Sequence, residues 1–340
     1  MKISATNIML ITGIIIFVIY LQTIGIESLI TEIMSINLFI LIIAILIDIV
    51  CIGLFTLGWC VFLKNPGIEF KKCFEIVLIS IFGDLMIPTA SISGEFLRVN
   101  LTAKKGKISI SEALSSVIIH RIILALTFGF LLLISGLLLI SQSINIIGGY
   151  TILSIAIIDI TVILILTYAV MKLCKFRKYI EAFGLKIGKL LKKIRRNYNP
   201  NDLKVKISNN FEKFELCIRS IKLNTFIISF IVLTLRWFLI ALIPYVMFIS
   251  LGYDVSYWIV VSVSTLVSMV QMIPIGIPGM IGVMEVSITA FFISFGIPSS
   301  IAASVTILMR IVTFWFELFI GAIATSIQGI RGIRELSNSV

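Results

Sequence analysis

The sequence has few of the residues that most catalytic and metal sites need. It contains one histidine, His120, and five scattered cysteines without a CxxC pair. A single histidine excludes two-histidine lipid phosphatases and zinc proteases with an HExxH helix. The cysteine spacing supports neither a disulfide framework nor a metal site. We therefore expect no metal, no cofactor and no enzymatic activity.

Charge is also scarce, and it is unevenly distributed. Of 340 residues, 13% are charged and 59% are hydrophobic, which excludes a soluble globular domain. Residues 172–222 contain 15 basic and four acidic residues, so this segment alone accounts for the net charge of +11. No nucleic-acid-binding motif accompanies it. We predict a cytoplasmic linker that faces anionic lipid, either as a simple anchor or to gather lipid headgroups.

Two apolar stripes at helical spacing, in residues 180–194 and 207–221, predict amphipathic helices within this linker. Elsewhere the chain is dominated by apolar runs, and a membrane span needs about 20 such residues. Six runs are long enough: 8–24, 36–63, 114–140, 150–173, 225–251 and 301–327. Two further apolar pieces, 74–92 and 257–295, are interrupted by proline and glycine. Their length and composition do not decide whether these two pieces cross the membrane.

The distribution of positive charge indicates how the two interrupted pieces run. Cytoplasmic loops carry the excess of lysine and arginine. If 74–92 crossed completely, Arg98 and the lysines after it would lie outside, so we predict that it enters and returns to the cytoplasmic face. By the same rule, 257–295 enters and leaves by the outer face, which keeps Arg331 inside. The alternative is that the prolines only kink ordinary helices.

These patterns predict an all-α polytopic membrane protein with an inverted-topology repeat, about six full spans and two re-entrant or broken helical hairpins. The first repeat is 1–171, the linker is 172–222 and the second repeat is 223–340. We expect both termini in the cytoplasm and the protein in the plasma membrane. Non-helical backbone at membrane depth requires surrounding protein or a water-filled cavity, so we expect a polar cavity where the hairpins meet.

Both breaks are followed by the same pair of charged residues. Glu95 precedes Arg121 by 26 positions, and Glu285 precedes Arg310 by 25 positions. This nearly equal spacing is the main indication of a repeat. The residues expected to break or hinge the helices are Pro88, Gly94, Pro278, Gly279 and Gly282.

Ionisable residues at membrane depth cost at least about 2.5 kcal/mol each and usually mark a pathway or an internal pair. The candidate substrate-binding residues are Glu95, Arg98, Arg121, Arg236, Glu285 and Arg310. The secondary candidates are Asp48, His120 and Glu317. Guanidinium forks bind phosphate, and carboxylates bind an amine, a hydroxyl or a proton, so a charged lipid headgroup fits this set. Asp159 has no evident partner.

Each candidate also has a purely structural interpretation. Asp48 and Arg236 lie at corresponding positions of the two halves and could pair with each other. Arg310 and Glu317 are seven residues apart and could partly neutralise each other. The glutamates that follow the breaks could stabilise helix N-termini. His120 could form an interhelical hydrogen bond or relay a proton.

Both breaks resemble the motifs of a known family. After Pro88, residues 94–98 read Gly-Glu-Phe-Leu-Arg, similar to a proline followed by Gly-Glu-x-x-Arg. Residues 278–285 read Pro-Gly-Met-Ile-Gly-Val-Met-Glu, similar to Pro-Gly-Gly-x-Gly-x-x-Glu. Over nearly its whole length the chain resembles the flippase-like transmembrane family of lysylphosphatidylglycerol synthases and their stand-alone relatives. It departs from the family at 89–93, which lack a basic residue, and at Met280, where the family has glycine.

The resemblance implies translocation of a charged lipid: aminoacylated phosphatidylglycerol in the best-known members, glycosylated or prenyl lipids in others. The chain shows no counterpart of the soluble aminoacyl-transferase domain, so we expect a translocator without a synthase. The expected partners are anionic or phosphate-bearing membrane lipids and no nucleic acid. The alternatives are an ion- or proton-coupled exporter of a small anionic solute and a non-transporting subunit of a membrane glycosyltransferase.

Overall fold

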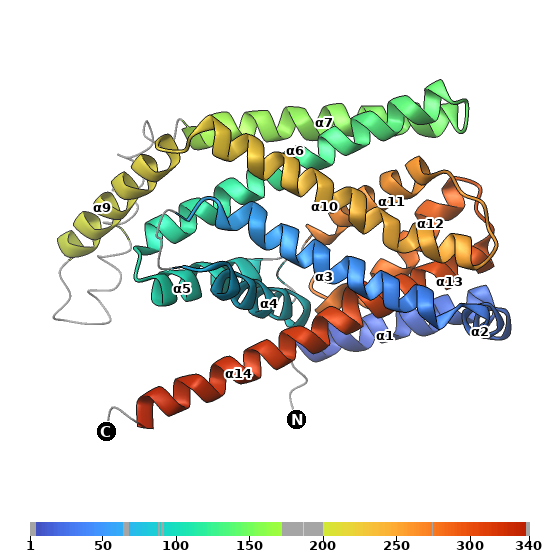
Figure 1. The fold of residues 1–340 in the computed structure, drawn as a ribbon, viewed down its shortest axis with the longest axis horizontal. Helices are drawn as coiled ribbons and strands as arrows, with labels where there is room; N and C mark the ends of the chain where they lie inside the picture. Colours follow the sequence, from blue (N-terminus) through green and yellow to red (C-terminus); the bar gives the residue numbers. More distant parts are fainter. Residues whose placement is uncertain are drawn as a thin grey trace.

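The computed structural model describes residues 5–63, 68–87, 89, 92–171, 186, 200–273 and 275–337, and the regular structure within these ranges is helical. Figure 1 shows the arrangement. The elements are α1 (Ala5–Ile24), α2 (Ile26–Ser35), α3 (Leu38–Cys60), α4 (Phe70–Met86), α5 (Ile92–Gly106), α6 (Ile110–Ser141), α7 (Ile146–Met171), α9 (Pro200–Arg219), α10 (Leu223–Ser250), α11 (Tyr257–Gln271), the 3-10 turn η2 (Pro278–Met280), α12 (Val283–Ser294), α13 (Ser299–Arg310), the π-helical segment η3 (Ile311–Phe316) and α14 (Glu317–Ser337).

Five helices of the described ranges are long and apolar enough to cross a membrane. They are α3, α6, α7, α10 and the continuous helix Ser299–Ile330, which joins α13, η3 and α14. The remaining predicted span, 8–24, is the apolar part of α1 and is shorter. The prediction of an all-α polytopic membrane protein is confirmed.

Polar residues at the helix starts define where several of these helices begin. The side chain of Asn37 accepts a hydrogen bond from the backbone N–H of Phe39 at the start of α3. Ser109 and Glu112 form a capping box at the start of α6. The side chain of Ser256 accepts a hydrogen bond from the backbone N–H of Trp258 at the start of α11. Each cap satisfies backbone donors that the first helical turn leaves free.

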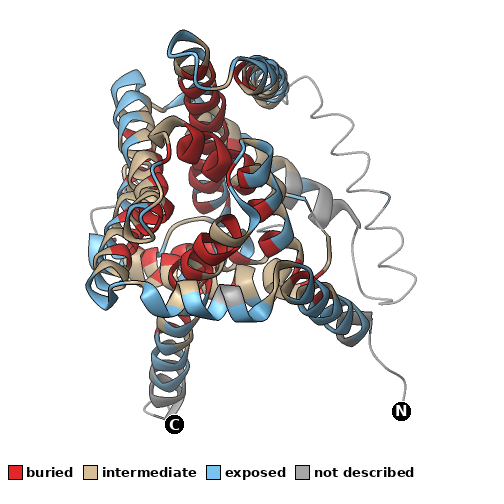
Figure 2. Ribbon diagram, turned by 90° about the vertical axis from the view of Figure 1, so that its right-hand side faces the viewer, coloured by how far each residue is buried: buried red, intermediate tan, exposed pale blue. Residues whose placement is uncertain are grey.

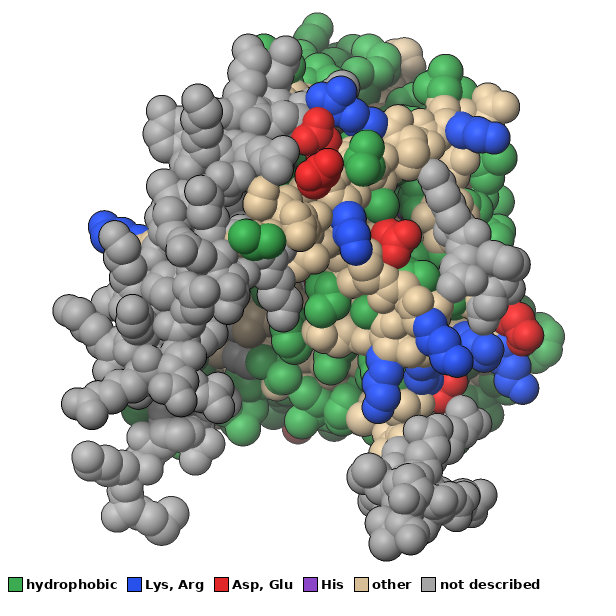
Figure 3. Space-filling model, turned by 90° about the vertical axis from the view of Figure 1, so that its left-hand side faces the viewer, with side chains coloured by type: hydrophobic (Ala, Val, Ile, Leu, Met, Phe, Trp, Pro, Cys, Tyr) green, Lys and Arg blue, Asp and Glu red, His purple; other side chains and the backbone are tan. Residues whose placement is uncertain are grey.

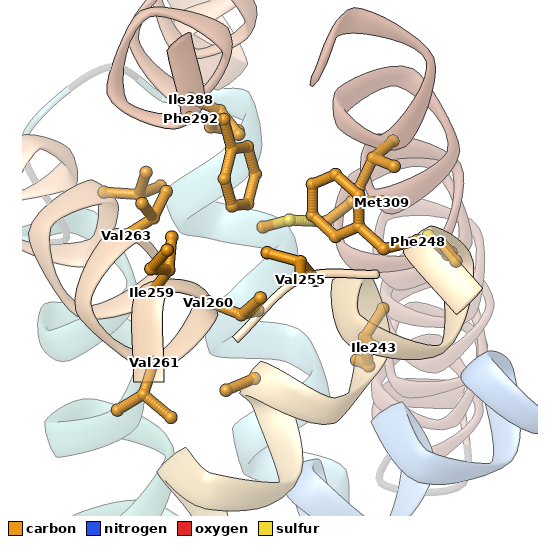
Figure 4. Close-up of a cluster of buried hydrophobic side chains, with 14 of the residues drawn as sticks. Ile243, Phe248, Val255, Ile259, Val260, Val261, Val263, Ile288, Phe292 and Met309 are labelled. Carbon is orange, nitrogen blue, oxygen red and sulfur yellow. The ribbon is translucent and has the colours of Figure 1, made fainter. Parts of the chain in front are cut away.

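The long helices pack in antiparallel pairs along the long axis of the molecule. α3 packs against α10, where Ser229 Oγ donates to the backbone carbonyl of Gly58 at 2.7 Å, and α6 packs against α7. Exposed residues lie on the outer faces of the helices and buried ones face inward (Figure 2). The largest core joins α10, α11, α12 and α13, with Phe248 and Phe292 in an edge-to-face contact at 4.9 Å (Figure 4).

Two helical hairpins approach the middle of the molecule from opposite ends. α4 and α5 contact each other near one end of the long axis, and α11 and α12 do so toward the other (Figure 1). α4 contacts η2, so the closed ends of the hairpins meet. The returning arm of the first hairpin continues to Gly106, beyond the predicted end at residue 92. An inverted repeat relating the two halves stays a prediction.

Some predictions fall on residues whose structure is not described. The prolyl residue of the first break, Pro88, is one of them, and so is most of the first amphipathic stripe, 180–194. The second stripe lies mostly within the helix α9, which ends at Arg219 shortly before α10 begins.

Candidate functional site

A cavity of about 270 Å³ lies where the two hairpins meet. Asp48 is the eleventh of 23 residues in α3, and Arg236 is the fourteenth of 28 in α10. Both line the cavity, so it lies halfway along two helices that are long enough to span a membrane. Its charged lining residues are Asp48, Asp84, Glu95, Arg98, Arg121, Arg236, Arg310 and Glu317. Seven of these eight residues were predicted from the sequence, whereas the predicted Glu285 does not line the cavity.

The first hairpin contributes an ion pair that is open to the cavity. Arg121 Nη1 lies 2.9 Å from Glu95 Oε1. Glu95 lies in the first turn of α5, and Arg121 lies on α6. The two side chains remain 27% and 32% exposed. A pair with this exposure can exchange its partner for a ligand at modest cost.

The second hairpin contributes the corresponding ion pair, but this one is buried. Arg310 Nε donates to Glu285 Oε1 at 2.7 Å, and both side chains are 6% exposed. The second carboxylate oxygen accepts from the backbone N–H of Gly282 at 2.6 Å, which confirms a helix-start role for this glutamate. Arg310 Nη2 also donates to the backbone carbonyl of Gly279 at 2.9 Å. The pair therefore connects the η2 turn to α12 and α13 through hydrogen bonds.

The second break depends on glycine at two positions. Gly279 has φ +60° and Gly282 has φ +84°, a region that residues with a Cβ rarely adopt. Pro278 begins the η2 turn between 277 and 281. Gly94 was predicted as a hinge, but it lies inside the helix α5. An added Cβ at this position would collide with Asp84 and with the backbone of α4. It serves close packing of α4 on α5.

The other two arginines of the cavity rest on aromatic rings. The guanidinium carbon of Arg98 lies 5.3 Å from the ring centre of Phe55 and 5.1 Å from that of Trp59. The guanidinium carbon of Arg236 lies 5.0 Å from the ring centre of the same Phe55 and 4.6 Å from that of Trp237. Within the described ranges neither arginine has a carboxylate oxygen within 4.0 Å.

This arrangement corrects one of the pairings considered from the sequence. Asp48 has no nitrogen of Arg236 within 4.0 Å, and its carboxyl group lies beside that of Glu317. Arg310 forms its ion pair with Glu285, while Glu317 lies beyond 4.0 Å and interacts with it only through its charge. Two carboxyl groups can hydrogen-bond only if one of them carries a proton. We therefore expect the Asp48–Glu317 pair to share one proton at the cavity wall.

His120 lies behind the cavity wall, completely buried, with Nδ1 3.5 Å from Arg98 Nη1 and its ring edge-on to Phe55 at 4.6 Å. This is the interhelical contact considered from the sequence. Asp159 lies where α7 packs on α6, beside Gly129, and its Oδ2 atom is buried without a hydrogen-bond partner. It does not line the cavity.

Sequence reasoning missed Asp84. Its carboxylate accepts hydrogen bonds from the backbone N–H of Gly94 at 2.7 Å and from Ser93 Oγ at 3.2 Å, which ties α4 to the start of α5. An acidic residue inside an apolar helix, one turn before a proline, was the available signal. Uncharged polar residues of the lining were missed too: Ser264, Ser268, Gln271 and Thr313. No cluster of three potential metal ligands occurs among the residues with described structure.

Comparison with known proteins gives one family and several relatives. A family model described as the lysylphosphatidylglycerol synthase TM region matches residues 5–321. A UPF0104 membrane protein of Pyrococcus horikoshii is 29% identical over 331 residues, covering 93% of this chain and 95% of that protein. A UPF0104 membrane protein of Methanocaldococcus jannaschii is 25% identical, with 95% of each chain covered. A third, from Methanothermobacter thermautotrophicus, is 25% identical and covers 83% of each.

Proposed function

Because this chain belongs to the lysylphosphatidylglycerol synthase TM-region family, we propose that it is a membrane lipid translocase. It moves the headgroup of a charged phospholipid or polyprenyl phosphate through the cavity between the hairpins. The acyl chains stay in the bilayer during this movement. In this proposal the protein transports lipid and catalyses no reaction.

The observation that carries the proposal is the cavity itself. Four arginines from four different elements converge on it, halfway along the spanning helices. Arginine in such a position favours phosphate over neutral ligands. The volume of about 270 Å³ is just below the roughly 300–1,000 Å³ of sites that enclose drug-sized molecules. A headgroup fits this space, whereas a whole lipid does not.

The two ion pairs support movement of the headgroup between the leaflets. The Glu95–Arg121 pair faces the cavity, while the Glu285–Arg310 pair is buried beneath the second hairpin. In the proposed cycle the first pair admits the headgroup from one side while the second keeps the other side closed. Opening of the second pair then releases the headgroup to the opposite leaflet.

The distribution of charge supports an orientation for this cycle. Lysines and arginines gather at the end of the molecule that carries the open end of the first hairpin, including the exposed Lys71, Lys72 and Lys104 (Figure 3). Asp254 lies at the opposite end, between α10 and α11 (Figure 1). The positive-inside rule makes the basic end cytoplasmic. We extend the proposal to a plasma membrane protein with both termini in the cytoplasm.

A second candidate function has one observation in its favour. The carboxyl pair of Asp48 and Glu317 holds a proton beside Arg236, as a proton-coupled exporter of a small anionic solute would require. Such an exporter would carry soluble anions in liposomes of any lipid composition. The lipid translocase would move headgroup-labelled lipid instead.

The test is headgroup movement in proteoliposomes that contain fluorescently labelled phosphatidylglycerol. Glu95→Gln and Arg121→Ala should abolish the protein-dependent movement while leaving helix content and elution in detergent unchanged. Lys105→Gln is the matched control, because Lys105 pairs with Glu75 outside the cavity, at 3.2 Å. If both cavity variants move lipid at the parent rate, the proposal is wrong.

A further inference from the structure

We propose that Arg98 and Arg236 together form a binding site for a phosphate group, with Phe55 as their common support. The site deepens the proposed function, since it assigns the headgroup phosphate of the lipid to two of the four arginines. Its ligand class is a singly charged phosphate, of which a lipid phosphodiester is one source and free phosphate is another.

The four arginines of the cavity divide into two classes. Arg121 and Arg310 are each held by a glutamate within 2.9 Å. Arg98 and Arg236 have no such partner among the residues that the structure describes, and the Nε atom of each is buried without a hydrogen-bond acceptor. A buried donor without an acceptor is costly, and a guanidinium more so. An anion in the cavity would balance the charge of both guanidinium groups.

The arrangement places both arginines on one cavity. Arg98, Arg236 and Phe55 all line it, and both guanidinium carbons lie within 5.3 Å of the ring centre of Phe55. A tetrahedral phosphate offers separate oxygen pairs to two guanidinium forks. Trp59 and Trp237 provide a second ring beside each guanidinium group, with ring centres 5.1 Å and 4.6 Å from the guanidinium carbons. Because the forks are already fixed, binding orders few side chains.

The surrounding carboxyl groups restrict the charge of the ligand. Asp84 and Glu95 lie on the side of Arg98, and the proton-sharing pair of Asp48 and Glu317 lies on the side of Arg236. None of their oxygens reaches either guanidinium within 4.0 Å. Their negative charge nevertheless opposes a phosphate dianion more than a monoanion. The site therefore favours a phosphodiester over inorganic phosphate at neutral pH.

Binding can be measured without transport, in phosphate-free buffer and a maltoside detergent. Trp59 and Trp237 contact the two guanidinium groups, so tryptophan fluorescence should report occupancy. The probes are dioctanoyl phosphatidylglycerol, inorganic phosphate and, as the phosphate-free control, dioctanoylglycerol. The variants are Arg98→Gln and Arg236→Gln, with Arg219→Gln on α9 as the matched control that removes one cation outside the cavity.

We expect saturable binding of dioctanoyl phosphatidylglycerol to the parent and to Arg219→Gln, weaker binding of inorganic phosphate and none of dioctanoylglycerol. Each of the two cavity variants should weaken phospholipid binding about tenfold or more. Arg236→Lys keeps the charge but loses the fork, so its affinity should fall between the parent and Arg236→Gln. It also provides a folded variant if the glutamine forms do not accumulate.

The outcomes separate the site from the proposed function. Unchanged phospholipid affinity in Arg98→Gln and in both Arg236 variants overturns the site, even if lipid still moves in proteoliposomes. Loss of binding in these variants supports the site, even if the parent moves no lipid, in which case the translocase proposal fails alone. Tighter binding of inorganic phosphate than of phospholipid, lost in the same variants, keeps the phosphate site and assigns it to a soluble source.

Discussion

The buried pair of Glu285 and Arg310 offers a prediction whose size follows from the structure. Glu285→Gln leaves the arginine charged, 6% exposed and without a counterion. Breaking a buried pair by removing one partner costs about 3–5 kcal/mol. The glutamine oxygen still accepts one hydrogen bond, so we expect the low end, about 3 kcal/mol. This is a large share of the roughly 5–15 kcal/mol that stabilises a typical domain.

Glu95→Gln provides the internal comparison, because it removes the equivalent charge from the more exposed pair. Its expected cost is about 1 kcal/mol or less. The assay is denaturant unfolding in mixed micelles, followed by helix content, with each variant compared with the parent. Adding Arg310→Met to Glu285→Gln removes the stranded cation, and about half or more of the lost stability should return.

Equal destabilisation by the two glutamine substitutions would contradict this reasoning, since burial would then make no difference. A double variant less stable than Glu285→Gln would do so as well. It would show that Arg310 stabilises the protein through its contact with the carbonyl of Gly279 or with the ring of Phe314, which lies 4.1 Å from the guanidinium carbon.

Three further predictions concern other parts of the chain. Gly282→Ala should destabilise the protein by about 1 kcal/mol or more, because its φ is +84° and the added methyl would meet α1, whereas Gly53→Ala, with open space around it, should be neutral or slightly stabilising in the same unfolding assay. Asp48→Asn should cost less than about 1 kcal/mol by that assay, because an amide replaces a carboxyl of a pair that already shares one proton. For orientation, Lys104→Cys should react with an impermeant maleimide only after the cells are opened, and Asp254→Cys should react in intact cells; the reverse pattern would invert the proposed topology.

The sequence predicted the charged lining well because charge inside an apolar run has few explanations. Arg121 and Arg310 were found by their positions in spans, and the nearly equal spacing from Glu95 and Glu285 marked them as equivalents, but only the structure shows that each pairs with its glutamate. In both halves the glutamate lies at the start of the helix that follows the break. The arginine lies on the next helix along the chain and forms an ion pair with that glutamate. Spacing along the chain thus indicated an equivalence that composition alone could not reveal.

Partner choice elsewhere could not be predicted, because it depends on how each helix is rotated about its axis. Asp48 and Arg236 lie at equal depth on neighbouring helices, yet Arg236 points to aromatic rings and Asp48 to a carboxyl group. Depth is readable from the apolar run, whereas rotation is set by packing in the whole bundle. Met280 shows a local limit of the same kind, since it adopts φ +50° where a glycine would be expected.

The π-helical segment Ile311–Phe316 separates Arg310 from Glu317, and so it sets the angular offset between two parts of the site. An α-helix turns about 100° per residue, and a π turn inserts one additional residue into the winding. Rewinding this segment as an ordinary α-helix would swing Glu317 about 100° around the axis and away from Asp48. The contact between Glu317 and Asp48 and the salt bridge between Arg310 and Glu285 are therefore coupled through six residues of a single helix.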